Sequence, residues 1–233
     1  MSVTVSPIAQ IFQPGTPQVR TFSDNFSRVG GASLFDRYIY STVPGVGAAL
    51  ANLSYFGADN TGSTFNALHA GTGAVNGWIA MIYPKVMVNN SLVNSKNQFV
   101  QLTFNIFTNQ TESGATFMSR WDYNLQNAYQ MVFLNNGGVQ LFRLIAWQGV
   151  TPRILHSSAP GFVLGDVVRA ECAVTPGVNN VITLTKNGVN IVAPITDADP
   201  TRPVEGIVGL TVGPDFVAAA GVAQWDNFFC GAL

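Results

Sequence analysis

The chain has 233 residues and a formal net charge of −1, and only 10% of its residues are charged. This length predicts one large domain or two small ones, with enough buried surface for a core that needs no disulfide or metal. The weak charge excludes the clusters of Lys or Arg with which proteins bind nucleic acid or anionic membranes, so neither is an expected partner.

Residues 1–20 are predicted to form an extended arm. Pro7, Pro14 and Pro17 interrupt strand pairing, and Arg20 is the only charged side chain. The segment has no apolar core of a secretory signal, so we expect synthesis in the cytoplasm. Burial of its apolar side chains would contribute on the order of 10 kcal/mol before ordering costs, which favours docking on another chain or on the parent domain over a disordered tail. These side chains are Val3, Val5, Ile8, Ile11 and Phe12.

Residues 21–233 are predicted to form one all-β domain. Short β-rich runs alternate with Gly, Pro and Asn, and no window has a sustained helical period. This many short strands predicts two packed antiparallel sheets. The expected strands are Thr21–Ser27, Ala48–Phe56, Thr64–His69, Trp78–Tyr83, Gln98–Phe107, Ala115–Trp121, Ala128–Leu134, Val139–Trp147, Asp166–Val174, Val181–Lys186, Val189–Ala193, Gly206–Val212 and Phe216–Phe229.

Two Asn-Gly pairs predict hairpins, because both residue types tolerate the positive φ of a type I′ turn. A turn at Asn187-Gly188 has aliphatic residues on one face and polar residues on the other. The expected pairs there are Lys186 with Val189, Leu184 with Ile191, and Ile182 with Ala193.

A turn at Asn136-Gly137 pairs Leu134 with Val139 and Val132 with Leu141. Its second face is apolar too, so both faces need a cover, which could be a loop, a neighbouring subunit or a ligand. We expect a loop or a subunit, and the candidate subunit contacts are Tyr129, Met131, Phe142 and Leu144.

Six segments carry a resemblance to a known family. They are FSDNFSR (22–28), YQMVFLNNGGVQLFRL (129–144), GDVVRAECAV (165–174), ITLTKNGVNI (182–191), DAD (197–199) and AQWDNFF (223–229). In this order they resemble the concanavalin A-like lectin/glucanase (LamG-like) jelly roll, in the form found in bacteriophage virion proteins. The resemblance implies an antiparallel two-sheet β-sandwich in which the first and last strands are neighbours.

No catalytic or metal-binding constellation is recognisable. The glucanases of this fold use alternating acids, because a retaining mechanism needs two carboxyl groups about 5–5.5 Å apart, and no glutamate here has an acid two or four positions away. Asp197 and Asp199 alternate beside prolines, where capping of a turn is favoured over calcium binding, which is left open. We therefore expect no enzyme, no cofactor and no metal. Cys172 and Cys230 are expected to be buried free thiols, although a disulfide is the alternative.

Sugar binding needs only an aromatic platform with polar neighbours. Trp121 with Asp122 and Tyr123, or Trp147 with Gln148, could supply one, although both tryptophans fit core or rim positions at strand ends.

The resemblance and the arm together favour a structural protein of a phage virion, made in the host cytoplasm. We expect a capsid decoration (cement) or tail protein, a homotrimer that docks on capsid or other virion proteins through its arm. The alternative is a carbohydrate-binding module of a phage tail or fibre adsorption apparatus.

Overall fold

The computed structural model describes most of the chain from residue 96 onward and several short strands before it. The described ranges are 21–25, 38–42, 57–59, 67–69, 80–84, 96–107, 113–119, 127–136, 139–148, 151–212 and 223–233. The predicted arm, residues 1–20, and Trp121, Asp122 and Tyr123 lie outside these ranges. No helix in the described part of the chain is long and apolar enough to cross a membrane.

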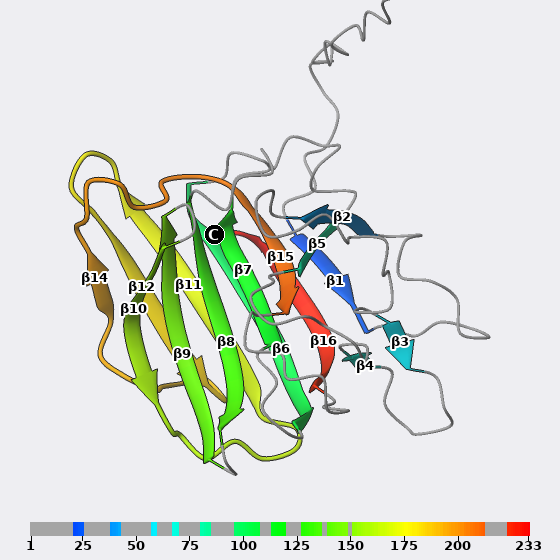
Figure 1. Ribbon diagram of the computed structural model, residues 1–233. Coiled ribbons are helices and arrows are strands. Elements are labelled where there is room, and N and C mark those ends of the chain that lie inside the picture. Colours follow the sequence, from blue (N-terminus) through cyan, green and yellow to red (C-terminus); the bar gives the residue numbers. More distant parts are fainter. Residues whose placement is uncertain are drawn as a thin grey trace, which may run out of the picture.

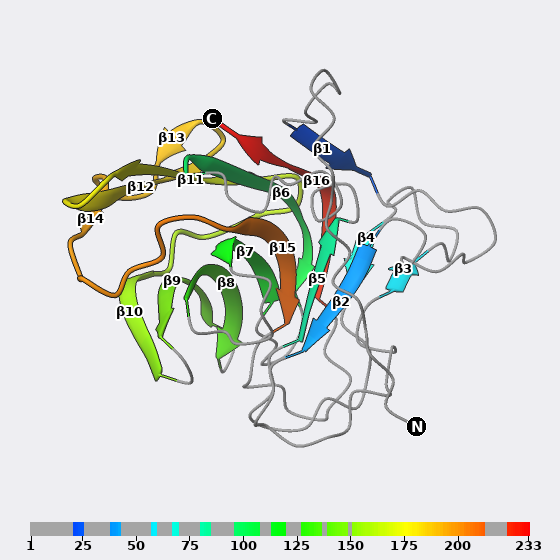
Figure 2. The same cartoon turned by 90° about the horizontal axis from the view of Figure 1, so that it is seen from above.

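The described strands form two antiparallel sheets that stack face to face, which confirms the predicted sandwich (Figures 1 and 2). Sheet A contains β1 (Thr21–Asp24), β3 (Gly57–Asp59), β4 (Ala67–His69), β6 (Gln98–Phe107), β11 (Val167–Thr175), β12 (Asn179–Lys186), β13 (Val189–Asn190), β14 (Ile195–Asp197) and β16 (Ala223–Ala232). Its order is β13-β12-β11-β6-β16-β4-β3, and β1 pairs with β16 while β14 pairs with β12. The first and last described strands are therefore neighbours, as expected.

Sheet B contains β2 (Tyr38–Thr42), β5 (Ala80–Pro84), β7 (Ser113–Ser119), β8 (Ala128–Asn136), β9 (Val139–Gln148), β10 (Thr151–Ser158) and β15 (Ile207–Val212). Its order is β10-β9-β8-β7-β15-β5-β2. Seen from above, sheet B curves beneath sheet A, and β10 and β14 lie at the same open edge of the sandwich (Figure 2).

The core lies between the two sheets and is rich in aromatic rings. The Phe133 ring of β8 lies 4.5 Å from Trp225 of β16 and 4.7 Å from Phe162, measured between ring centroids. Sheet A contributes alternate residues, since every second side chain of β11 and β12 is buried while its neighbours face outward. Cys172 and Cys230 belong to this core as free, buried thiols, as predicted.

The Asn187-Gly188 turn forms as predicted. Both residues have positive φ, 53° and 79°, and Lys186 pairs with Val189. The Ile191 N–H still donates to the Leu184 carbonyl (2.9 Å). The expected pair of Ile182 with Ala193 is wrong, because the chain bends after Ile191 and pairs with β12 again at β14, where Ile195 faces Ile182.

The hairpin β8–β9 forms with a different register from the predicted one. Asn136 pairs with Val139, so the two-residue loop is 137–138, and Leu134 faces Leu141 rather than Val139. The proposed subunit contacts are also wrong, because these side chains face sheet A and are fully buried in the shared core. They are Tyr129, Met131, Phe142 and Leu144.

The opposite face of β8 is buried as well, within the single chain. Val132 and Gln130 are both 0% exposed. Gln130 donates to Thr211 of β15 (Nε2 to Oγ1, 3.0 Å) and accepts from the indole of Trp147 in β9 (2.6 Å). The prediction that this strand needs a cover on both sides is therefore confirmed, and the cover belongs to the same chain.

Several described strands were not predicted, and β10 matters most for function. Its sequence TPRILHSS contains Pro152 and lacks a regular apolar alternation. Proline is tolerated in edge strands, and β10 is the edge of sheet B. β14 was expected to be a loop, and β2 and β3 were not expected as strands.

Candidate functional site

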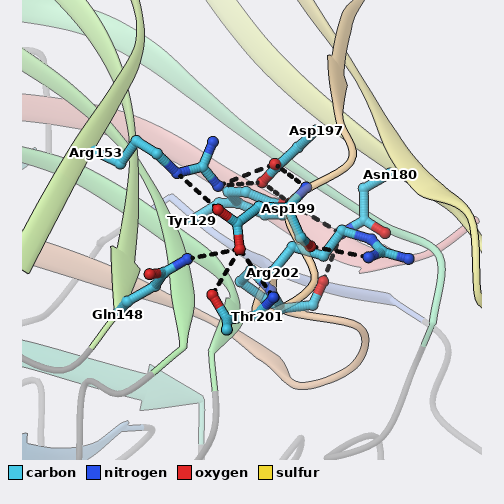
Figure 3. Close-up of polar contacts among 9 residues, drawn as sticks. Tyr129, Gln148, Arg153, Asn180, Asp197, Asp199, Thr201 and Arg202 are labelled. Carbon is cyan, nitrogen blue, oxygen red and sulfur yellow. Dashed lines mark hydrogen bonds and ion pairs between the residues drawn. The ribbon is translucent and has the colours of Figure 1, made fainter.

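A polar cluster lies at the open edge of the sandwich, between β10 of sheet B and β12 and β14 of sheet A (Figure 3). The hairpin at Asn187-Gly188 brings the chain back along β12, where Asp197 pairs with Asn180. The next turn carries Asp199. From the other sheet, Tyr129 of β8 and Arg153 of β10 reach the same place. The topology therefore brings together residues far apart in the chain.

The inner half of the cluster is a buried, ion-paired carboxylate. Asp197 is 2% exposed, and the Arg153 Nη2 atom donates to both of its carboxylate oxygens at 2.9 Å. The Tyr129 hydroxyl donates to Oδ2 at 2.8 Å, and the Asp199 amide N–H donates to Oδ1 at 3.1 Å. Asn180 in turn donates to the Tyr129 oxygen at 2.9 Å. A buried charge with a counter-ion and several donors is well compensated.

Burial and the Asp197 charge change the pKa values of two neighbouring groups, Tyr129 and Cys172. They raise the pKa of Tyr129 far above its ordinary value, so its hydroxyl stays neutral and remains a donor to Asp197. The same two causes raise the pKa of Cys172 to about 12. Both groups therefore keep their protons at neutral pH, and the local geometry is not sensitive to their titration.

The outer half of the cluster is half-exposed and consists of Gln148, Arg153, Asp199 and Thr201, which we call the Arg153 rim. The Arg153 side chain is 36% exposed and that of Asp199 is 30% exposed. Asp199 Oδ1 accepts from Thr201 N–H (2.8 Å), Thr201 Oγ1 (2.6 Å) and Gln148 Nε2 (3.1 Å). The hydrogen bonds from Thr201 and the nearby Arg153 charge lower the pKa of Asp199, which stays ionised.

The turn after Asp199 holds the rim in place. The Arg202 backbone N–H and its Nη1 atom both donate to the Asp199 carbonyl oxygen, at 3.1 and 2.9 Å. Asp199 caps this turn with its carboxylate, as the sequence predicts for an aspartate before proline. The rim side chains are thus fixed before any ligand arrives.

Three buried side-chain atoms of the cluster have no hydrogen-bond partner in the described part of the chain. They are the Nε atoms of Arg153 and Arg202 and the Oδ1 atom of Asn180. Arg153 Nε lies 3.7 Å from Asp199 Oδ2, an ion pair without a hydrogen bond. A buried polar atom without a partner costs about 1–3 kcal/mol, and native proteins rarely tolerate it.

The chemistry of the cluster suits binding by hydrogen bonds. The donor and cationic neighbours of Asp199 lower its pKa, whereas a general acid needs a raised pKa. Within the described ranges, no group of three or more His, Cys, Asp or Glu is placed to hold a metal ion.

The other site residues predicted from the sequence lie in different environments. Trp147 is only 6% exposed and its indole donates to Gln130, so it is an interior side chain and offers no exposed platform. Its neighbour Gln148 does lie in the rim. The sequence reasoning missed Arg153, Thr201 and Arg202, although the segment DADPTR (197–202) concentrates charge in a weakly charged chain and was a usable signal.

Comparisons with known proteins support the fold. No protein-family model matches the chain, and no curated protein matches it in sequence. Among solved structures it is similar to an engineered GH43 glycoside hydrolase with endo-xylanase and exo-arabinofuranosidase activity (TM-score 0.58, 11% identity, 96% of this chain and 42% of that one). It is also similar to the alginate lyase Aly36B (TM-score 0.53, 11% identity, 92% and 97%).

A xylan β-1,4-xylosidase from Bacillus halodurans C-125 gives a TM-score of 0.51 at 12% identity, over 99% of this chain and 42% of the xylosidase. The chain thus spans less than half of the two glycoside hydrolases and nearly all of the lyase. At such identities the likeness concerns the fold alone. The chain folds as a β-sandwich of the concanavalin A-like lectin/glucanase type.

Proposed function

We propose that this protein is a carbohydrate-binding module without catalytic activity, and that the Arg153 rim contacts its glycan. The observation that carries the proposal is the rim itself. A carboxylate, a guanidinium, an amide and a hydroxyl are half-exposed side by side, and a buried ion-paired network beneath them fixes their positions. Sugar hydroxyls both donate and accept, so a mixed set of this kind matches them.

Preorganisation makes the rim a better candidate than an ordinary polar surface. The Arg153 guanidinium is anchored on Asp197, and Asp199 is held by Thr201 and Gln148. Side chains that are already ordered lose little conformational entropy when a ligand binds. The fold adds support, because structurally similar proteins include enzymes named for xylan and alginate.

The test is a glycan-binding experiment with a matched pair of variants. The wild-type protein is screened against a panel of plant, algal and bacterial polysaccharides by affinity electrophoresis, and hits are measured by calorimetry. Gln148→Ala removes the amide of the rim and is expected to weaken binding roughly tenfold, the value of one hydrogen bond of about 1–1.5 kcal/mol.

Gln101→Ala is the control, since Gln101 is a half-buried glutamine on β6 of sheet A, away from the rim. It should leave affinity unchanged. Absence of binding to every glycan in the panel, or an equal effect of the two variants, would contradict the proposal.

A further inference from the structure

The charges of the polar cluster balance, so net charge does not select its ligand. Arg153 and Arg202 contribute +2, and Asp197 and Asp199 contribute −2, which sums to zero. What selects the ligand is the set of hydrogen-bonding groups that the protein has not already used. This inference rests on the proposed glycan-binding function.

Most of the carboxylate oxygens already accept hydrogen bonds from groups of the protein. Both oxygens of Asp197 accept from Arg153, and each accepts one further hydrogen bond. Asp199 Oδ1 accepts three hydrogen bonds, and the Asp199 carbonyl accepts two more from Arg202. Among the described residues, the acceptors that remain at the rim include Asp199 Oδ2 and Gln148 Oε1.

The arginines, by contrast, keep most of their donors. A guanidinium carries five N–H groups. Arg153 uses only Nη2 in hydrogen bonds, and its Nη1 makes no hydrogen bond in the described part of the chain; in Figure 3 this nitrogen carries no dashed line and points away from both aspartates. Arg202 uses Nη1, while its Nε has no partner. Arg202 is buried, so the unused donors that a ligand can reach are those of Arg153.

Unused N–H donors on a half-exposed guanidinium favour a ligand group that only accepts hydrogen bonds. A sugar hydroxyl accepts and donates, whereas a carboxylate accepts only and matches the planar guanidinium. We propose that the Arg153 rim selects acidic glycans, with a uronate carboxylate on the Nη1 end of Arg153 and the neighbouring hydroxyls on Asp199 and Gln148.

The experiment compares two ligands of equal length. Galacturonate oligosaccharides and the same oligosaccharides after reduction of their carboxyl groups are titrated into the 233-residue protein by calorimetry. The wild type is expected to bind the uronate form at least tenfold more tightly. Raising the salt concentration should weaken uronate binding while leaving neutral binding nearly constant, because only the former includes an ion pair.

Arg153→Lys tests the residue while keeping a positive charge beside Asp197, and it should abolish most of the preference. Arg169→Lys is the control, since Arg169 lies on β11 over the Phe99 ring on the outer face of sheet A; it should keep the preference. Gln148→Ala retains Arg153 and should also keep the uronate preference while lowering affinity for both ligands.

Equal or tighter binding of the neutral oligosaccharide, or a preference that survives Arg153→Lys, would overturn the acidic-glycan inference and leave the binding function standing. If neither of these ligands nor any glycan of the panel binds, both proposals fail.

Discussion

Arg153→Ala removes the counter-ion of the buried Asp197 carboxylate. Loss of one partner from a fully buried ion pair costs about 3–5 kcal/mol, because the remaining charge is left without compensation. The Arg153 side chain is 36% exposed, so water can partly replace it. We therefore expect a loss of about 2–3 kcal/mol in the free energy of unfolding.

A double-mutant cycle isolates this interaction. Urea unfolding is measured for the wild type, Arg153→Ala, Asp197→Ala and the double variant. Once the carboxylate is gone, loss of the arginine should cost little, so the coupling energy should exceed about 1 kcal/mol.

Arg169 and Glu171 provide a matched control, since they form an ion pair of 2.7 Å with side chains that are 25% and 39% exposed. Their coupling should stay below about 1 kcal/mol. If the two cycles give the same coupling, the buried carboxylate is not the source of the cost and the reasoning is wrong.

Three further predictions address the core, the acid limit and the arm. Phe133→Ala should lower the free energy of unfolding by about 3–5 kcal/mol in urea, since the ring packs against Trp225 and Phe162; a loss under 1 kcal/mol would contradict the described core. Burial alone would raise the pKa of Asp166, but hydrogen bonds from the Val163 N–H and a neighbouring amide, with a nearby lysine, lower it overall. Its stabilisation is therefore present above the unfolded pKa of about 3.9 and lost as pH falls below it, so Asp166→Asn should flatten acid unfolding below about pH 4, measured by circular dichroism. Deletion of residues 1–20 should abolish attachment to capsids or trimers if the virion prediction holds, and should leave glycan binding intact, as sedimentation and calorimetry would show.

The parts of the fold that were predictable depend on local chemistry. The Asn187-Gly188 turn was found because only a few residue types accept the backbone angles it requires, and Leu184 and Ile182 then fall on the inner face. The hairpin at 137–138 was placed one residue out, since NNGG (135–138) contains two possible two-residue loops. Both of its faces are buried, so the apolar pattern could not choose between them.

The candidate site was less predictable because it is assembled from distant segments. Arg153 and Asp197 are 44 positions apart, and no periodicity links them. Asp197 and Asp199 were noticed, but β10 was not predicted as a strand, because Pro152 and polar residues interrupt it. Without that edge strand, no argument from the sequence could place a guanidinium beside the aspartates.

Both faces of β8 are buried, which affects how the register of this strand is determined. The register of a strand is usually set because one face is buried and the other is exposed to solvent. A slip of one residue then exposes apolar side chains. Here a slip would exchange two equally enclosed rows, so the polar side chains set the register. It would separate the Gln130 amide from Thr211 and Trp147, and the Tyr129 hydroxyl from Asp197. Two buried polar side chains thus fix the register of the strand, and an apolar residue of the same size in place of Gln130 would lower the penalty for misalignment.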